Sequence, residues 1–343
     1  MIRVGIDLSP LDDQSKYRGI GKYTERLVGA LKKVSDIELI DYSKEKNVDL
    51  IHYPFFDFFF LTLPLFKPKK TVVTIHDCIP LAFPDQYPPG VKGRSKFLIQ
   101  RTSLTNASAV ITDSENSKND IVKYLNYPTE KIHVVYLAAD SSFGVVKNVK
   151  EKNEIRKKYK LPKKFVLYVG DVNYNKNLPS LIKAFSQVRD KADLVLVGKS
   201  FENKNLNEVK EILSLIKELG LEEKVHFTGY VADADLKVIY NLASVYCLVS
   251  LYEGFGLGVL EAMSCGCPVV TSNLSSLPEA VGDSALLIDP YSIDEISKAI
   301  KKFLDSKKER EEYTKKGIKR AGLFSWRKVA EETAEVYKKV TEK

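Results

Sequence analysis

Short apolar runs alternate with longer segments of helical period along the whole chain. The apolar runs are continuous stretches of Val, Ile and Leu, which is typical of strands covered on both faces and therefore of parallel sheets. In the first half this pattern predicts strands at residues 2–8, 49–53, 71–75, 109–112 and 132–136, and helices at 21–34, 95–106 and 117–125. In the second half it predicts strands at 165–169, 194–197, 225–228, 245–249, 268–271 and 285–288, and helices at 179–188, 207–219, 234–242 and 257–264. We therefore expect two successive α/β domains, each built on an open, doubly wound parallel sheet.

A polar, lysine-rich stretch at residues 141–164 separates the two halves. It contains Leu161 and Pro162 directly before the first strand of the second half, which is typical of a domain boundary. Residues 325–340 have a helical period with an apolar stripe that includes Trp326 and Tyr337. We predict a first domain at residues 1–160, a second at 161–324, and a C-terminal helical segment at 325–343.

Composition narrows the class of protein. The chain has 343 residues, of which 44% are hydrophobic and 29% are charged, as expected of a globular protein with two domains. No run approaches the roughly 20 apolar residues of a membrane span, and the N-terminus enters a strand without the apolar core of a signal peptide. We therefore expect a cytoplasmic protein.

Charge and cysteines add two exclusions. The net charge is +8, but the lysines are spread along polar helix faces and no nucleic-acid-binding module accompanies them, so we expect no nucleic-acid partner. A basic surface also suits a phosphorylated ligand or an anionic membrane face. Cys265 and Cys267 flank Gly266, and small buried positions explain them better than a redox or metal pair.

Ligands of open α/β sheets bind outside the carboxyl ends of the strands, and two such loops in the first half carry unusual residues. Residues 18–22 contain Gly19 and Gly21, which allow close backbone approach to a ligand. Thr24 occupies the third glycine position of a dinucleotide fingerprint, so that function is not indicated. His76 follows a buried strand, and it is either a ligand contact or a side chain held in a local turn by Asp77.

Two loops of the second half are more informative. Gly170 leaves a strand and Lys176 precedes a helix, which indicates either a phosphate site or a solvated lysine. In residues 250–263 a strand ends, a turn with Gly254 and Gly256 follows, and a helix starts near Leu257. The N–H groups at such a helix start bind anionic phosphate. Glu253 in the loop and Glu261 on the helix are placed to accept hydrogen bonds from different hydroxyls of one sugar-containing ligand.

The spacing of Glu253 and Glu261 resembles the E-x7-E motif of retaining glycosyltransferases with the GT-B fold, in particular the GT4-type family. Residues 263–270, 18–24, 74–80 and the pair Ser325-Trp326 resemble that family in the same order, so the resemblance covers nearly the whole chain. Residues 74–80 and 250–278 look most like bacterial and archaeal mannosyltransferases. The resemblance implies two Rossmann-like domains facing a cleft, with the C-terminal helix crossing back to the first domain.

The resemblance also implies roles for individual residues. Glu261 would bind the ribose of a nucleotide-sugar donor, Glu253 would hold its sugar, and Lys176 would neutralise its diphosphate. His76 would contact the transferring sugar, so His76, Glu253 and Lys176 form the expected catalytic set. The remaining donor-binding residues would line the loops around the donor; they are Gly19, Gly21, Gly170, Tyr230, Val231, Gly254, Phe255, Gly256 and Leu257. The implied reaction retains anomeric configuration, uses no cofactor besides the donor substrate, and needs no metal.

Two features of the sequence bear on the resemblance to this family. The family places an Arg before the lysine of the phosphate loop, but Asp171, Asn173 and Asn175 occupy that stretch here. Asp233-Ala234-Asp235 imitates a D-x-D metal motif, yet it precedes an amphipathic helix and is better explained by helix capping.

An aromatic segment at residues 55–66 has two interpretations. It combines six phenylalanines with Pro64 and is followed by lysines, and either it packs in the core or it forms an apolar surface for an acceptor or a membrane. The phenylalanines are Phe55, Phe56, Phe58, Phe59, Phe60 and Phe66.

We predict a retaining hexosyltransferase that moves mannose from GDP-mannose to a glycan or lipid-linked acceptor, with peripheral membrane contact. The alternatives are a UDP-sugar donor such as UDP-glucose or UDP-GlcNAc, another GT-B enzyme such as a phosphorylase or an epimerase, and a non-catalytic Rossmann-type binding module.

Overall fold

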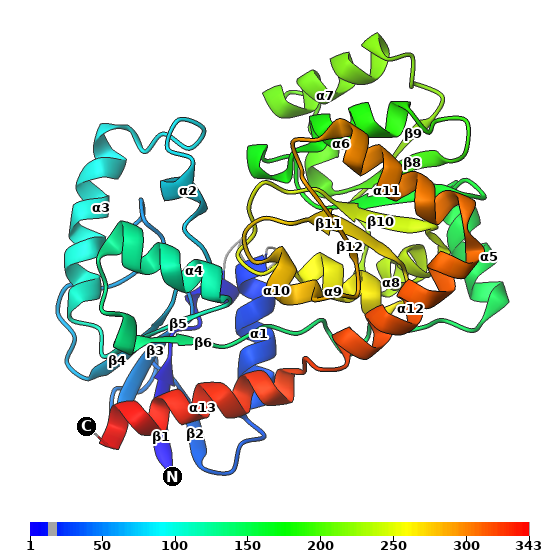
Figure 1. Ribbon diagram of the computed structural model, residues 1–343. Coiled ribbons are helices and arrows are strands. Elements are labelled where there is room, and N and C mark those ends of the chain that lie inside the picture. The colour runs from blue at the N-terminus through cyan, green and yellow to red at the C-terminus, as the bar shows by residue number, and fades with distance from the viewer. Residues whose placement is uncertain (13–18, 343) are drawn as a thin grey trace. The chain divides into compact units, whose positions relative to one another are not determined.

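The computed structural model describes residues 1–12 and 19–342, and the chain divides into two compact units. The first comprises Met1–Leu137 and Phe324–Lys343, and the second comprises Ala138–Leu323. Each unit is built on a six-stranded sheet in which every pairing is parallel (Figure 1). The two parallel α/β sheets expected from the continuous apolar runs are confirmed.

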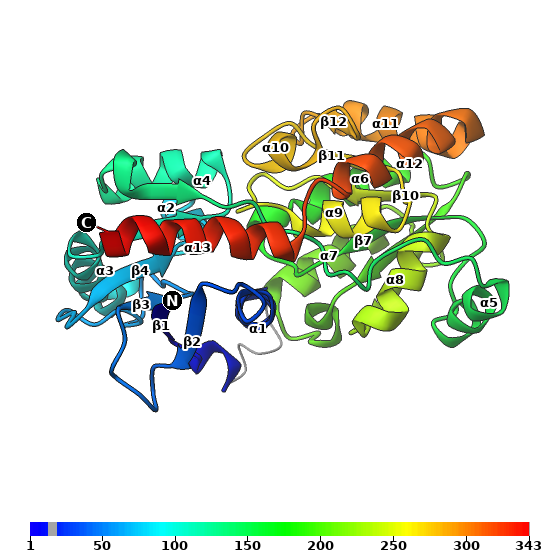
Figure 2. The same cartoon turned by 90° about the horizontal axis from the view of Figure 1, so that it is seen from below.

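The sheet of the first unit has the order β2-β1-β3-β4-β5-β6. Helix α1 and the long C-terminal helix α13 pack together on one of its faces (Figure 2), and α3 covers the core on the other. The strands are β1 (Ile2–Ile6), β2 (Ile37–Asp41), β3 (Leu50–Tyr53), β4 (Lys70–Thr74), β5 (Ala109–Thr112) and β6 (Ile132–Val134). The helices are α1 (Gly19–Leu31), α2 (Ile79–Ala82), α3 (Gly90–Thr105), α4 (Glu115–Asp120) and α13 (Trp326–Glu342), with shorter turns at Ser9–Leu11, Ile121–Leu125 and Thr129–Lys131.

The sheet of the second unit has the order β12-β11-β10-β7-β8-β9. Helices α6, α7 and α11 form one layer, and α8, α9 and α12 form the other. The strands are β7 (Phe165–Val169), β8 (Asp193–Val197), β9 (Val225–Gly229), β10 (Val245–Leu248), β11 (Val269–Ser272) and β12 (Leu286–Ile288). The helices are α5 (Val149–Lys158), α6 (Leu178–Ser186), α7 (Asn207–Glu218), α8 (Asp233–Leu242), α9 (Leu257–Ser264), α10 (Leu277–Val281), α11 (Ile293–Asp305) and α12 (Lys307–Ala321), with single turns at Tyr174–Lys176 and Lys199–Glu202.

The structure differs from the sequence prediction at the domain boundary. The first unit ends at Leu137, whereas the predicted first domain extends to residue 160. The polar segment between them forms α5, whose start is capped by the Asn148 side chain. Helix α5 packs against α8, and Lys158 Nζ lies 2.6 Å from Asp235 Oδ2, so this segment belongs to the second unit.

Strand β2 was not expected. Only Ile37 and Ile40 of this strand are buried, and Glu38 is exposed, because β2 is an edge strand of the sheet. It therefore lacks the continuous apolar run that marks the central strands.

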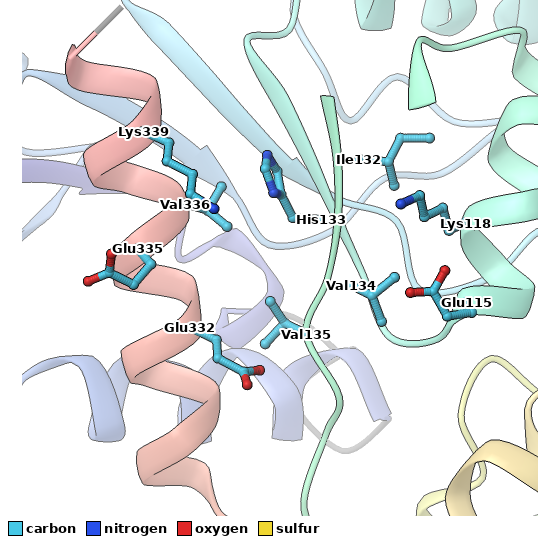
Figure 3. Close-up of a pocket in the computed structure, with 10 residues that line it drawn as sticks. All are labelled: Glu115, Lys118, Ile132, His133, Val134, Val135, Glu332, Glu335, Val336 and Lys339. Atoms are coloured by element: carbon cyan, nitrogen blue, oxygen red, sulfur yellow. The ribbon is translucent and has the colours of Figure 1, made fainter. Parts of the chain in front are cut away.

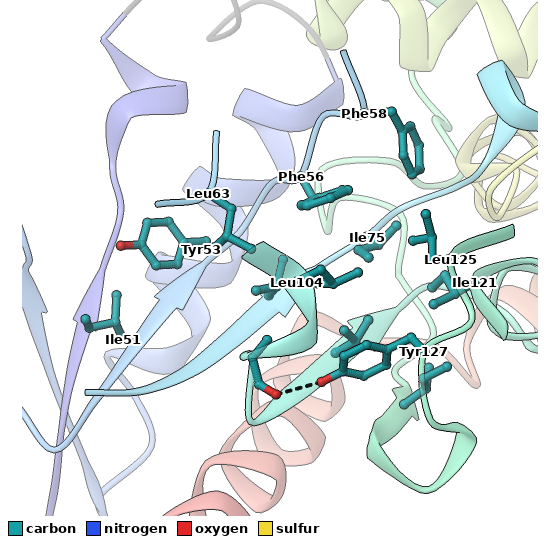
Figure 4. Packing of buried hydrophobic residues seen from close by; sticks show 14 of the residues in the cluster. Ile51, Tyr53, Phe56, Phe58, Leu63, Ile75, Leu104, Ile121, Leu125 and Tyr127 are labelled. Atoms are coloured by element: carbon teal, nitrogen blue, oxygen red, sulfur yellow. Dashed lines mark hydrogen bonds between the residues drawn. The ribbon is translucent and has the colours of Figure 1, made fainter. Parts of the chain in front are cut away.

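The phenylalanine-rich segment is divided between core and surface. Phe56 and Phe58 are 4% and 5% exposed and pack in a core cluster with Leu63, as Figure 4 shows. By contrast, Phe60 is 63% exposed and Phe66 is 80% exposed. The core interpretation therefore holds for Phe56 and Phe58, and a surface for an acceptor or a membrane stays a prediction for the exposed rings.

The four cysteines are buried thiols. Burial raises the pKa of Cys265 to about 12, which keeps this thiol protonated and unreactive. The expectation of small buried positions rather than a redox pair is confirmed. In the described part of the chain, no helix combines the length and the apolar character needed to cross a bilayer.

Candidate functional site

The predicted donor-binding residues of the second unit lie at the carboxyl ends of neighbouring strands. Gly170 follows β7, Tyr230 follows β9, and Glu253 lies in the loop after β10. Strands β10, β7, β8 and β9 are adjacent in the sheet, so these loops gather along one edge. This is where ligands bind in open α/β sheets.

Lys176 and Glu253 form an ion pair across this edge. Lys176 Nζ lies 2.7 Å from Glu253 Oε1 and 2.9 Å from Oε2, and the Ser250 hydroxyl donates to Oε1 at 2.6 Å. The Glu253 backbone is fixed as well, because its N–H donates to Ser275 and its carbonyl accepts from Ser276. The pair thus places a cation and an anion in fixed positions at the loop that follows β10.

Helix α9 starts directly after this loop. Gly256 has a φ of +92°, and a Cβ at this position would lie 2.7 Å from the Leu277 Cδ2 atom. Only glycine fits this conformation and this space, so Gly256 allows the chain to turn from the loop into the helix at Leu257. Gly254 is partly exposed and Phe255 is buried in the same turn.

Replacing Gly256 by Ala is expected to lower the free energy of unfolding by about 1–3 kcal/mol, because the residue must adopt a positive φ and displace Leu277. The control is Gly29→Ala in α1, where a Cβ meets nothing within 4 Å. That substitution should stabilise the helix by up to about 1 kcal/mol. Urea denaturation of both variants measures the difference, and equal effects of the two would contradict the assignment.

Glu261 lies on α9, and its Oε2 atom accepts a hydrogen bond of 3.3 Å from the Tyr240 hydroxyl. Burial, and then the neighbouring Tyr246 and Glu261, raise the pKa of Tyr240 well above its ordinary value. Tyr240 therefore remains a donor and orients the carboxylate. This tyrosine comes from α8 and is not among the residues predicted from the sequence.

The loops after β7 and β8 approach each other closely. A Cβ at Gly198 would lie 2.1 Å from the Gly170 carbonyl oxygen, and Gly170 has a φ of +154°. Further along the edge, Tyr230 is 57% exposed and donates its N–H to Glu202, while Val231 is buried. Of these two predicted residues, only the Tyr230 ring is therefore open to solvent.

Of the predicted residues in the first unit, Gly19 and Gly21 lie at the start of α1, and Gly21 is buried. Arg18 of the same motif lies outside the described residues. His76 follows β4, and its Nδ1 atom lies 2.7 Å from Asp113 Oδ2 at the end of β5. Asp77, considered as a partner of His76 from the sequence, accepts a hydrogen bond from the Ile79 N–H, and its charge also acts on the His76 ring.

The apparent metal motif has another role. Asp235 binds Lys158 and the Tyr159 hydroxyl, at 2.6 Å and 2.8 Å. The N-cap residue of α8 is Ala232, whose side chain makes no capping hydrogen bond, so the predicted capping by an aspartate side chain is wrong. Asp235 instead forms an ion pair that fixes α5. Within residues 1–12 and 19–342, no group of three or more Cys, His, Asp or Glu side chains is arranged to hold a metal.

A groove of about 360 Å³ lies elsewhere, at the open edge of the first sheet (Figure 3). It runs along β6 between α4 and α13, with Glu115 and Lys118 on one side and Glu332 and Lys339 on the other. None of the predicted site residues lines it.

Comparison with known proteins identifies the family. Residues 151–320 match the family described as glycosyl transferases group 1, and residues 18–143 match glycosyltransferase family 4. The O-antigen chain mannosyltransferase B of Escherichia coli is 34% identical over 279 residues, which cover 79% of this chain and 70% of that protein. The serotype-specific mannosyltransferase WbdA of Escherichia coli is 29% identical over 269 residues, which cover 77% of this chain but 32% of that protein.

A solved structure agrees with these matches. Anabaena HepE in complex with UDP-glucose superimposes with a TM-score of 0.78 at 18% identity, covering 99% of this chain and 100% of that one. The fold is thus shared along the whole chain. We conclude that this chain is a glycosyltransferase with the GT-B fold and belongs to glycosyltransferase family 4.

Proposed function

We propose that this chain transfers mannose from GDP-mannose to a glycan or lipid-linked acceptor, with retention of anomeric configuration and without a metal ion. The observation that carries the proposal is the fixed Lys176–Glu253 ion pair beside the start of α9. Glu261 lies further along the same helix. The named mannosyltransferases among the relatives favour mannose as the sugar.

Each group has a defined task in this proposal. Lys176 and the N–H groups at the start of α9 stabilise the negative charge of the departing diphosphate. Glu253 accepts hydrogen bonds from hydroxyls of the sugar, and Glu261 accepts them from the ribose. The loop backbone at Gly170 and residues 254–257 line the diphosphate, and Tyr230 with Val231 contacts the base. His76 of the first unit contacts the transferring sugar, and Gly19 and Gly21 of the same unit line the donor.

A UDP-sugar is the alternative donor, because HepE was solved with UDP-glucose. Thermal unfolding with GDP-mannose, UDP-glucose and UDP-GlcNAc distinguishes them, since a ligand that binds the native state stabilises it. We expect GDP-mannose to give the largest rise in Tm. A rise in Tm with a UDP-sugar alone would show that the donor is a UDP-sugar, and the assignment of the donor site would stand.

Glu261→Ala is expected to weaken binding of GDP-mannose by about 1–3 kcal/mol, because hydrogen bonds to a charged acceptor are lost. Glu279→Ala in α10 is the control, since it removes a carboxylate of the same unit that is not assigned to the donor. Isothermal titration calorimetry measures both. Unchanged affinity in a folded Glu261→Ala protein would remove this residue from the donor site.

Metal independence is tested separately. Because Lys176 and the helix N-terminus already supply positive charge, we expect EDTA to leave the transfer rate unchanged. Loss of activity in EDTA that is restored by manganese would contradict this part of the proposal.

We further propose that the enzyme works in the cytoplasm at an anionic membrane face, through a surface of the first unit formed by residues 58–70 and α3. These segments contain seven lysines and arginines and no acidic residue. They also expose large apolar side chains, namely Phe60, Leu61, Leu65, Phe66, Val91, Leu98 and Ile99. Exposed apolar side chains among cations suit a bilayer with anionic head groups.

The two segments form one rigid surface. The Gln100 side chain of α3 donates to the Phe60 carbonyl at 2.7 Å and accepts from the Leu63 N–H. Lys96 Nζ lies 4.9 Å from the centre of the Phe60 ring. The backbone at Phe60 is thus fixed to α3 by the buried Gln100 side chain.

The double variant Phe60→Ser/Phe66→Ser is expected to remain folded and to lose most of its binding to vesicles of phosphatidylcholine with phosphatidylglycerol. The control is Val149→Ser/Tyr291→Ser, which removes two side chains of similar exposure from the second unit. Co-sedimentation at low and high salt measures binding, and salt should weaken that of the native chain. Equal vesicle binding by both variants would contradict the membrane surface.

A further inference from the structure

His76 is held on two sides by buried side chains. Its Nδ1 atom meets the carboxylate of Asp113, which is 3% exposed. The ring of Tyr23 packs against it nearly perpendicularly, with 4.5 Å between ring centres and 83° between planes. The imidazole is therefore fixed both in its plane and in its rotation.

The tyrosine is itself anchored through the core of the unit. Its hydroxyl lies 3.2 Å from Thr74 Oγ1, which lies 2.8 Å from His52 Nε2. His52 Nδ1 in turn lies 2.6 Å from the hydroxyl of Tyr337 in α13. These side chains are all nearly or completely buried, so the position of Tyr23 is set by α1, two central strands and the C-terminal helix together.

Two further polar atoms of the pair lack a hydrogen bond of normal geometry among the described residues. His76 Nε2 and Asp113 Oδ1 are buried, and neither makes a hydrogen bond of normal geometry within residues 1–12 and 19–342. Buried polar atoms are nearly always hydrogen-bonded in native proteins, because an unmade hydrogen bond is costly. Two such atoms on one pair at the carboxyl ends of β4 and β5 indicate that the pair is built to meet a ligand.

We infer that Asp113 is a positioning residue for the transfer reaction: it accepts the Nδ1–H of His76 and thereby fixes His76 with Nε2 directed at an oxygen of the sugar substrate. This inference rests on the proposed contact between His76 and the transferring sugar. A carboxylate that accepts one ring N–H sets the tautomer and the orientation of a histidine.

The charge of the pair supports this arrangement. Burial lowers the pKa of His76, but the charge of Asp113, its hydrogen bond, Asp77 and the nearby Pro54 carbonyl raise it, and the net pKa lies above the ordinary value. The other titratable groups facing the ring are Tyr23, whose pKa is raised by burial, and His52, whose pKa is lowered by burial. Burial also raises the pKa of Asp113, against the opposing charge and hydrogen bond of His76. His76 is the group of this cluster whose pKa shift favours a positive charge, and a protonated ring donates from Nε2.

A raised pKa keeps His76 protonated to higher pH, so activity that depends on the proton is present below this pKa and is lost as the pH rises through it. Asp113→Asn removes the charge that raises the pKa, and the alkaline limb of the kcat/KM profile should move to lower pH by about 1–3 units. The variant should also lose about ten- to a hundredfold in kcat, as for carboxylates that orient other functional histidines.

The matched control is Asp77→Asn, which removes an equal charge next to the ring without removing its hydrogen bond. It should move the alkaline limb much less than Asp113→Asn, and Asp113→Glu should restore part of the activity. If His76→Ala leaves transfer unchanged, the proposed role of His76 fails. If His76→Ala is inactive while Asp113→Asn retains the native rate and pH profile, the inference about Asp113 fails and the proposed function stands.

A measurement on the native chain keeps the inference testable even if Asp113→Asn does not fold. The chain has four histidines, and His76→Gln assigns the signals of His76 in long-range ¹H–¹⁵N spectra. We expect a proton on Nδ1 throughout the titration of this ring. A neutral ring protonated only on Nε2 would overturn the inference.

Discussion

Replacing Glu253 by Gln is expected to lower kcat/KM about 10²–10³-fold, the usual effect of removing one fixed electrostatic group from a transfer site. Gln has nearly the same shape, so the Ser250 contact and the packing of the β10 loop can persist. The charge that holds Lys176 is lost, however, and the sugar loses its anionic acceptor. Initial rates with GDP-mannose measure the effect, and Glu279→Gln in α10 serves as the charge control.

The Lys176–Glu253 pair predicts that substitutions of its two residues have non-additive effects on the free energy of unfolding. Lys176→Ala leaves the carboxylate of Glu253, a residue only 8% exposed, without its counter-charge. We expect this variant to lose about 3 kcal/mol, the lower end of the range for a broken buried pair. The double variant Lys176→Ala/Glu253→Gln should lose less than the sum of the Lys176→Ala and Glu253→Gln changes. Strict additivity in urea denaturation would show that the two charges do not stabilise each other.

Acidification is expected to destabilise the protein strongly through His52. Burial, and then the charge of His76, lower the pKa of this fully buried histidine from 6.5 to about 3. Between these pH values the unfolded chain binds a proton that the native chain excludes. Stability is therefore lost as the pH falls, by about 1.4 kcal/mol per pH unit and about 4 kcal/mol over the window.

His52→Gln isolates this contribution from the carboxylates that also titrate in acid. The variant keeps an amide for Thr74 or Tyr337 but has no titrating group, so its free energy of unfolding should depend less on pH between 6.5 and 4. His76 acts in the opposite direction, because its raised pKa adds stability at low pH. Identical pH slopes for the native chain and His52→Gln would falsify the buried neutral histidine.

The sheets could be predicted because their central strands are continuous apolar runs. Residues 165–169 and 245–249 are apolar at nearly every position, and both segments form buried strands, β7 and β10. Strand β2 could not be predicted in this way, because an edge strand needs only half of its side chains to be apolar. The polar segment before residue 160 resembles a domain boundary in sequence, because α5 buries only Ile155 and so has almost no apolar face.

The candidate site could be predicted in its components but not in its pairings. Lys176 and Glu253 are both prominent in the sequence, yet they are 77 residues apart. Their contact depends on β7 and β10 being neighbours, and strand order is a tertiary property. For the same reason Asp113 was missed as the partner of His76, although it also follows a buried strand directly.

The phenylalanines show a further limit of the sequence. Phe58 and Phe60 have the same side chain and lie two positions apart, but one is buried and the other is exposed. Gln100 decides this difference by fixing the loop to α3, and a glutamine in a helix carries no signal of that role.

The central claim is mannosyl transfer from GDP-mannose with retention, and real-time ¹H NMR tests it most directly. The native chain is incubated with GDP-mannose and a mannose-containing oligosaccharide, with the much slower Glu253→Gln variant as the control. We predict a new anomeric signal of an α-linked mannose that grows together with free GDP. A β-linked product, or no release of GDP by the native chain under conditions in which a UDP-sugar is consumed, would contradict the account.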